Sequence, residues 1–136
     1  MPEYIDTLIC DAIRPEANQK MSLLGVLGDE IFVPQVPTQL VSLAFFERWK
    51  RSEGDIAGQT FRFSFQIGIP GLGAPIVLPE RNAVVPDSPR ATMNFVAQIQ
   101  GFPIPQEGIF EFRTLIDGQQ RHVLKFFVGL PAVAKP

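Results

Sequence analysis

The stretch from Phe102 to Val128 decides the fold, and it reads F-P-I-P-Q-E-G-I-F-E-F-R-T-L-I-D-G-Q-Q-R-H-V-L-K-F-F-V. Phe110 and Phe112 alternate with charged residues, which is the two-residue period of a strand that buries one face. Asp117-Gly118 then predicts a hairpin, because glycine accepts the positive φ that a tight reversal requires. This stretch therefore predicts two antiparallel strands joined at Gly118.

The apolar residues of the two strands set the register of the hairpin. A two-residue loop would place Phe110 opposite Lys125, whereas a three-residue loop places Phe110 and Phe112 on the same face as Leu124 and Phe126. A slip of one residue would turn every side chain to the wrong face. We therefore expect the three-residue loop or an equivalent bulge.

The prolines before the hairpin also carry a prediction. Pro103 and Pro105 cannot donate a hydrogen bond to a sheet, so we expect them in a connection rather than in a strand. The working frame is an all-antiparallel sheet that this hairpin closes.

Alternating apolar residues predict further strands. The cleanest is Thr60–Ile69, with Phe61, Phe63, Phe65, Ile67 and Ile69 on one face. Residues 79–90 contain three prolines and are expected to form a long connection between sheets. Further strands are expected at Tyr4–Asp11, Met21–Leu27, Glu30–Val33, Ile76–Leu78 and Ala91–Gln100.

Two of the predicted strands depart from simple alternation. Tyr4–Asp11 has no clearly polar face, which is typical of a strand covered on both sides or at the centre of a sheet. Leu40–Trp49 fits either a strand or a helical stripe of Val41, Phe45 and Trp49. The adjacent Phe45-Phe46 pair and the β-rich surroundings favour a strand. The polar residues 48–58 that follow are expected to form a loop.

The spacing of turn residues indicates the fold class. Thirteen prolines and eleven glycines are spread between short apolar runs, and seven to nine strands are expected. This pattern predicts an all-β antiparallel sandwich, immunoglobulin-like, C2-like or jelly-roll-like. A chain of 136 residues is expected to form one domain over residues 1–136, with 129–136 as an extended tail.

Charge and cysteine content narrow the classes of partner. The net charge is −2, acidic and basic residues are interspersed, and neither a nucleic-acid footprint nor a basic amphipathic helix is recognisable. We therefore expect no nucleic-acid or membrane partner. Cys10 is the single cysteine, so no disulfide can form within the chain, and no secretory signal is recognisable at residues 1–6. A reducing compartment, most simply the cytoplasm, is expected.

The chemistry-bearing residues do not form a recognisable catalytic set, and we expect neither activity nor cofactor. His122 is the only histidine and would need a nucleophile and an acid nearby in space to act as a base. Cys10 is expected to be a small buried apolar residue. Gly68–Gly73 lies between prolines that oppose a phosphate-binding helix and predicts a turn. A calcium site is not expected from the acidic residues near the N-terminal loops, Asp6, Asp11, Glu16, Asp29 and Glu30.

One surface candidate stands out. Arg48, Trp49, Lys50 and Arg51 combine an aromatic ring with three cations, a set that can stack on a base or a sugar or cap the groove of a partner. A half-buried tryptophan with solvated charges beside it is the competing interpretation.

The N-terminal third carries a resemblance to a known family. Ile9–Pro34 reads I-C-D-A-I-R-P-E-A-N-Q-K-M-S-L-L-G-V-L-G-D-E-I-F-V-P, and Glu107–Gly118 reads E-G-I-F-E-F-R-T-L-I-D-G. These segments resemble a family of small bacterial proteins classed as a domain of unknown function. At the turn Asn18-Gln19-Lys20, Gln19 replaces the glycine of that family. The resemblance implies a β-sandwich and brings no activity with it.

These observations favour a non-enzymatic protein-interaction or assembly module, which binds an unidentified protein or further copies of itself. The alternative is a sandwich that binds carbohydrate or lipid headgroups with its end loops near Trp49. A hydrolase or transferase would gain support only if folding brought His122 near a serine or cysteine and an acid.

Overall fold

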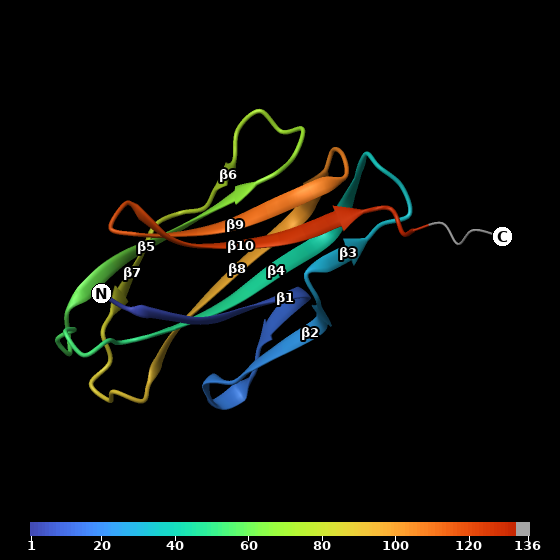
Figure 1. Cartoon of the computed structure of the whole chain (residues 1–136). Coiled ribbons are helices and arrows are strands. Elements are labelled where there is room, and N and C mark those ends of the chain that lie inside the picture. The colour runs from blue at the N-terminus through green and yellow to red at the C-terminus, as the bar shows by residue number, and fades with distance from the viewer. Residues whose placement is uncertain (133–136) are drawn as a thin grey trace.

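The structure, a computed structural model, describes residues 1–132 and contains ten strands and one short 3₁₀ turn, Ala17–Gln19, in that range. The strands form two sheets that lie one over the other, with the strands of one sheet at an angle to those of the other (Figure 1). In chain order they are β1 (Glu3–Pro15), β2 (Met21–Leu27), β3 (Glu30–Phe32), β4 (Thr38–Lys50), β5 (Thr60–Gly68), β6 (Ile76–Val77), β7 (Arg81–Val84), β8 (Thr92–Ile104), β9 (Gly108–Ile116) and β10 (Gln119–Gly129).

Each layer is one sheet. The four-stranded sheet has the order β2-β1-β4-β8. The six-stranded sheet has the order β3-β10-β9-β5-β6, and β7 also pairs with β5. The all-β sandwich predicted from the turn spacing is therefore confirmed.

The predicted apolar residues of the β9–β10 hairpin share one face, and a bulge in β10 sets this register. Ile116 pairs with Gln119, so the loop contains only Asp117 and Gly118, both with positive φ. The register then shifts by one residue between Gln120 and His122, and as a result Phe110 lies opposite Phe126. The loop length and the bulge together place the phenylalanines of both strands in the interior, as expected.

Aromatic rings fill the space between the two sheets. The rings of Phe45 and Phe112 stack with centroids 4.2 Å apart, and those of Phe63 and Phe95 stack at the same separation. Each pair joins a strand of one sheet to a strand of the other. Seven phenylalanines of this core are fully buried: Phe45, Phe63, Phe65, Phe102, Phe110, Phe112 and Phe126.

Several segment predictions are confirmed. Residues 40–49 form part of β4, a strand and not a helix. β1 lies inside its sheet between β2 and β4, which explains why neither of its faces is clearly polar. The five apolar residues of Thr60–Ile69 that were expected on one face are all buried.

Three predictions need correction. The described residues contain ten strands and not seven to nine, because Arg81–Val84 in the expected connection 79–90 pairs with β5 as β7. The sheets are not wholly antiparallel, since the chain crosses between layers at Gly28 and Asp29 and β3 then joins β10 in parallel. Pro103 belongs to β8, where an edge strand tolerates a residue without an N–H.

The predicted C-terminal tail overlaps the last strand by one residue. Gly129 still belongs to β10 and pairs with Phe32, so the predicted tail of residues 129–136 starts at Leu130. Residues 133–136 lie outside the described residues.

Candidate functional site

The outer face of the four-stranded sheet carries a second apolar cluster, separate from the aromatic core. Cys10, Ile13 and Ala44 are buried there, although no second layer covers this side of the sheet within the described residues. Leu23, Phe46 and Val96 pack around them and are only partly buried. The side chains of four adjacent strands therefore form one apolar surface.

Strand register adds two exposed residues to this surface. Leu8 lies opposite Phe46, and Val26 lies opposite Cys10. Leu8 is 38% exposed and Val26 is 57% exposed. We call the set Leu8, Leu23, Val26, Phe46 and Val96 the outer patch. A solvated sheet face normally carries polar residues, so the outer patch is an exception that a docking partner would explain.

An ion pair borders the outer patch. Asp6 lies opposite Arg48 in the register that places Leu8 opposite Phe46. Arg48 donates from Nε to Oδ1 of Asp6 over 2.8 Å and from Nη2 to Oδ2 over 2.5 Å. These hydrogen bonds from Arg48 lower the pKa of Asp6 below its usual range. The two charges cancel, so the surface around the outer patch carries no net charge from this pair.

β8 forms one edge of the same sheet. Its only pairing among residues 1–132 is with β4, from Thr38–Ile104 to Lys50–Thr92. Every second residue of an edge strand directs its N–H and C=O away from the sheet. The outer patch and an unpaired strand edge are therefore contiguous, because Val96 belongs to both.

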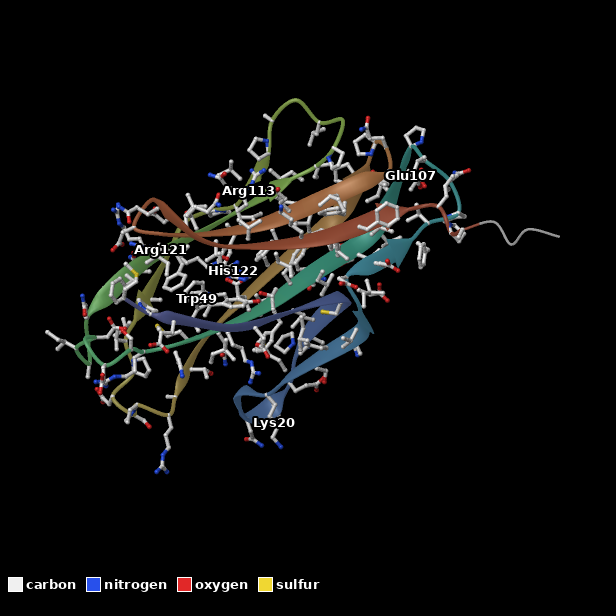
Figure 2. All side chains as sticks on the ribbon, in the orientation of Figure 1. Lys20, Trp49, Glu107, Arg113, Arg121 and His122 are labelled. Carbon is white, nitrogen blue, oxygen red and sulfur yellow. The ribbon has the colours of Figure 1, made fainter. Side chains whose placement is uncertain are left out.

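The predicted surface set Arg48, Trp49, Lys50 and Arg51 does not form one contact surface in the structure. Trp49 is 2% exposed, and its indole lies between the layers (Figure 2). The indole forms a T-shaped pair with the ring of Phe63, with centroids 5.7 Å apart. Lys50 forms an ion pair with Glu3 at 3.5 Å. The aromatic ring is thus not at the surface, and contact with a partner through the three cations stays a prediction.

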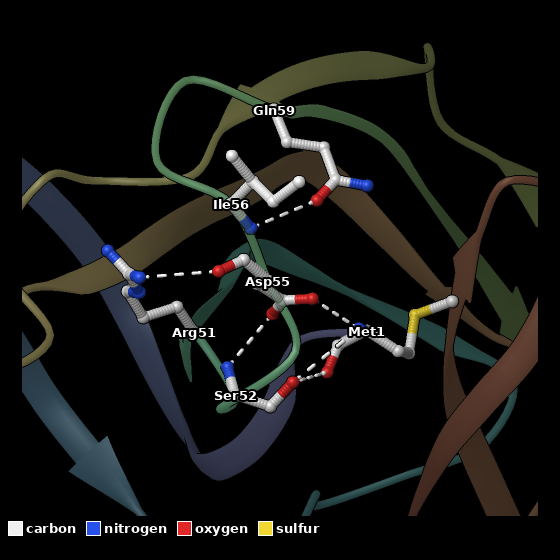
Figure 3. A network of polar contacts seen from close by, with 6 residues as sticks. All are labelled: Met1, Arg51, Ser52, Asp55, Ile56 and Gln59. Carbon is white, nitrogen blue, oxygen red and sulfur yellow. Dashed lines mark hydrogen bonds and ion pairs between the residues drawn. The ribbon is translucent and has the colours of Figure 1, made fainter.

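Arg51 belongs to a network that holds the loop after β4 (Figure 3). Its guanidinium donates to the Asp55 carbonyl at 3.2 Å, while the buried Asp55 carboxyl pairs with the amino group of Met1 and accepts from the Ser52 N–H. Burial raises the pKa of Asp55, but the hydrogen bonds from Met1 and Ser52 lower it below the usual value overall. The loop expected at residues 48–58 therefore contains strand residues up to Lys50 and a bonded turn beyond it.

A buried polar cluster links the two layers. Glu47 is 1% exposed and its carboxyl accepts hydrogen bonds from Thr7 Oγ1 at 2.7 Å, Trp49 Nε1 at 2.7 Å and Thr114 Oγ1 at 2.5 Å. These donors come from β1, β4 and β9. All three are satisfied by one side chain, which is the usual condition for burying a polar group.

His122 lies beside this cluster. Its ring stacks on that of Tyr4 with centroids 3.5 Å apart, and its Nδ1 is buried without a hydrogen-bond partner among residues 1–132. Burial lowers the pKa of His122, while the nearby charge of Glu47 acts in the opposite direction. Burial also raises the pKa of the Tyr4 phenol. No serine or cysteine hydrogen-bonds to His122 among the described residues.

The remaining candidates lie apart from one another. Cys10 is fully buried, burial raises the pKa of its thiol, and its Sγ lies 3.8 Å from the Ala44 carbonyl oxygen. No group of three or more His, Cys, Asp or Glu side chains within residues 1–132 is placed to hold a metal ion. No helix in that range is both long and apolar enough to cross a membrane.

The glycine-rich turn at residues 68–73 shapes a shallow hollow of about 300 Å³. Arg113 lies across Gly68, since a Cβ at Gly68 would be 2.5 Å from its Nη2. Glu111 accepts from Arg113 Nε at 2.9 Å, so the charge beside the hollow is neutralised. Gly71, with positive φ, lies in a turn as predicted, whereas Gly68 is the last residue of β5.

Sequence reasoning did not identify the outer patch. The signal was present in β4, where Leu43 and Phe45 occupy one face and Ala44 and Phe46 the other. Phe46 pairs with Leu8 and with Val96, which are 38 and 50 residues away in the chain. Alternation within one strand does not reveal such pairings.

The described residues thus form an all-β sandwich in which the outer face of the four-stranded sheet carries an apolar patch. The chain belongs to DUF6941, a family of unknown function that matches residues 6–129. The match begins inside β1 and ends with β10, and the resemblance to a family of unknown function is confirmed. No curated protein matches the chain.

Proposed function

We propose that this protein is a non-enzymatic interaction module that assembles with further copies of itself through the outer patch. The observation that carries the proposal is an apolar surface, spread over four strands, on the side of a sheet that no second layer covers among residues 1–132. Removing apolar surface from water stabilises an interface by roughly 25 cal/mol per Å² before the costs of association.

Charge favours a second copy as the occupant. The outer patch contains only Leu8, Leu23, Val26, Phe46 and Val96, and the ion pair that borders it is internally neutral. In a symmetric contact the same surface meets itself, so any net charge would face an equal charge. This surface meets that requirement.

The position of Trp49 argues against the ligand-binding alternative. That alternative needed an exposed aromatic ring in the end loops, and the indole is 2% exposed. The burial of Cys10 favours an inert thiol. The presence of a single cysteine, which has no partner within the chain, supports our proposal of a reducing compartment, most simply the bacterial cytoplasm.

A pair of matched substitutions tests the proposal. Val26→Lys introduces a charge into the outer patch, and Val77→Lys introduces the same charge on β6 of the six-stranded sheet. The two valines are similarly exposed, at 57% and 64%. Sedimentation velocity over a range of concentrations should show a concentration-dependent mass for the native protein and Val77→Lys, and a smaller mass for Val26→Lys.

Two results would refute the proposal. One is a native protein that remains a monomer at every concentration. The other is an assembly that Val26→Lys and Val77→Lys weaken equally, because the outer patch would then have no special role. Circular dichroism of both variants is expected to match the native spectrum, since surface substitutions at exposed positions change stability by about 0.5 kcal/mol or less.

A further inference from the structure

We propose that β8 is a second self-association site, at which two copies join edge to edge as antiparallel strands in a register centred on Val96. This inference goes beyond the outer patch, because a different observation carries it. That observation is a long strand edge, unpaired in the described part of the chain, whose first nine residues lack the features that normally protect such edges.

The free edge of β8 is unlike the other edges of the two sheets. β2, the opposite edge of the same sheet, has seven residues without a charge or a proline, but it is interrupted by Gly25, whose φ is +64°. β3 has three residues and β6 has two, bracketed by Pro75 and Pro79. β7 has four residues and begins with Arg81. Short strands, prolines and charges are the usual means by which proteins keep edges from pairing with other chains.

β8 is thirteen residues long, and its first nine residues lack such protection. Residues 92–100 read T-M-N-F-V-A-Q-I-Q and contain no charged residue, no proline and no glycine. The irregularities come only afterwards, at Gly101 with positive φ and at Pro103. The unprotected part of the edge is therefore long enough to form a ladder with another strand.

When residues 92–100 of two copies pair in antiparallel fashion, one register places polar residues opposite polar ones and apolar residues opposite apolar ones. With Val96 opposite Val96 of the second copy, Asn94 lies opposite Gln98, and Phe95 lies opposite Ala97. Asn94 and Gln98 are exposed, whereas Phe95 and Ala97 are buried in the core. Amide side chains thus meet amides on the outer face, and a large apolar residue meets a small one on the inner face.

A second copy is a better occupant than an extended segment of another protein. The pairing needs no complementary charge, because neither strand has a charge in this region. It also follows from the symmetry of a two-fold dimer, in which one strand pairs with itself. Such a dimer would place both outer patches on the same side of a continuous sheet, since a two-fold axis perpendicular to the sheet preserves its faces.

Disulfide cross-linking tests the register directly. In Val96→Cys the two new thiols would be directly opposite, with Cα atoms about 4.5–5.5 Å apart, within the range that a disulfide spans. In the control Asn94→Cys the equivalent Cα atoms would be about 13 Å apart along the strands. The native Cys10 is fully buried and should not cross-link. Val96 also belongs to the outer patch, so both cysteine variants are made on the Val26→Lys background, in which that surface should not associate. Mild oxidation should then give a covalent dimer of Val96→Cys and leave Asn94→Cys monomeric.

Paired charges provide a second test that does not depend on oxidation. Asn94→Lys/Gln98→Lys would place like charges opposite each other across the dimer, and Asn94→Lys/Gln98→Glu would place opposite charges there. Both variants lose the hydrogen bond that Gln98 Nε2 donates to Ser42 Oγ. Gln98→Glu keeps an oxygen that can accept from the Ile13 N–H and Gln98→Lys does not, so urea denaturation of both variants must show equal folding before their affinities are compared. The first should reduce dimer affinity at least tenfold relative to the second. Gln35→Lys/Gln120→Lys adds the same two charges outside β8 and should behave as the native protein.

The outcomes separate this inference from the proposed function. No cross-link in Val96→Cys, or an equal one in Asn94→Cys, overturns the β8 register. Equal affinities of the two charge variants overturn it as well. If Val26→Lys dissociates the assembly while Asn94→Lys/Gln98→Lys leaves it intact, the outer-patch proposal is supported and the β8 proposal is wrong. If Asn94→Lys/Gln98→Lys dissociates the assembly while Val26→Lys leaves it intact, the β8 proposal is supported and the outer-patch proposal is wrong.

Discussion

Phe45 and Phe46 are neighbours in β4, and they lie in the two different apolar regions of this protein. Phe45 is fully buried and stacks on Phe112 of the opposite sheet. Phe46 packs on the outer face against Cys10, Ala44 and Val96, with no second sheet above it among residues 1–132. The same residue type, in the same strand, is enclosed on one side and open on the other.

The comparison separates apolar residues that stabilise the fold from those available for binding. The inner cluster contains twenty-three buried residues from both sheets and fills the space between them. The outer cluster contains three, at the level of one sheet. A fold of this size can obtain its stability from the inner cluster alone. The apolar residues on the outer face are therefore not needed for folding to the same degree, which supports our proposal that they serve association.

Truncating the two phenylalanines should show this difference most clearly. Phe45→Ala removes a ring from a closed core and should lower the free energy of unfolding by about 3–5 kcal/mol. Phe46→Ala should lower it by about 1–2 kcal/mol in the monomer, because solvent already reaches part of the ring. Urea denaturation of both variants at low concentration measures the two costs. Equal losses would contradict the distinction between a closed and an open face.

The buried carboxyl of Glu47 belongs to the closed region, and its removal should have an intermediate effect. Glu47→Leu leaves the Trp49 Nε1–H without its acceptor and should cost about 1–3 kcal/mol. Glu47→Gln keeps an acceptor oxygen in place and should cost less. Thermal unfolding of the two variants provides the measurement. A Leu variant as stable as the native protein would show that these hydrogen bonds do not hold the layers together.

The smallest expected effect concerns pH and His122. Burial lowers the pKa of His122 below 6.5, so the unfolded chain binds a proton first as the pH falls. Stability from this site is complete above pH 6.5 and decreases as the pH drops toward the lower pKa of the folded state. His122→Phe keeps a ring against Tyr4 and removes the unpartnered Nδ1.

The variant should therefore be more stable by about 1 kcal/mol at pH 8, and its advantage should grow below pH 6.5. Unfolding free energies of both proteins at several pH values give the difference, in which the contributions of the other titrating groups cancel. A difference that does not change with pH would show that His122 is as easily protonated in the folded protein as in the unfolded chain.

Much of the sandwich followed from residues close together in the sequence. Phe61, Phe63 and Phe65 alternate within one strand, and Asp117-Gly118 marks its own turn, so local patterns were sufficient. β7 was missed because prolines at 79 and 86 surround a strand of only four residues. The parallel pairing of β3 with β10 was missed because it joins residues about a hundred positions apart.

The surface that we propose for association was less accessible to such reasoning. Trp49 was selected because cations surround it in the sequence. Its side chain, however, lies on the inner face of β4, where the indole contacts Glu47 and Phe63. The outer patch depends on which strands are neighbours, and a single sequence does not give that order. Burial of individual strands is therefore more predictable than the surface that several strands form together.

Side-chain footprinting by hydroxyl radicals would test most directly whether association uses the four-stranded sheet. Labelling should be compared at low concentration and at about a hundredfold higher concentration, where mass action favours assembly. The account predicts lower labelling of Leu8, Val26 and Phe46 at high concentration, with Val77 and Ile109 of the six-stranded sheet unchanged. Unchanged labelling of the outer patch, or protection of Val77 and Ile109 in its place, would contradict the account.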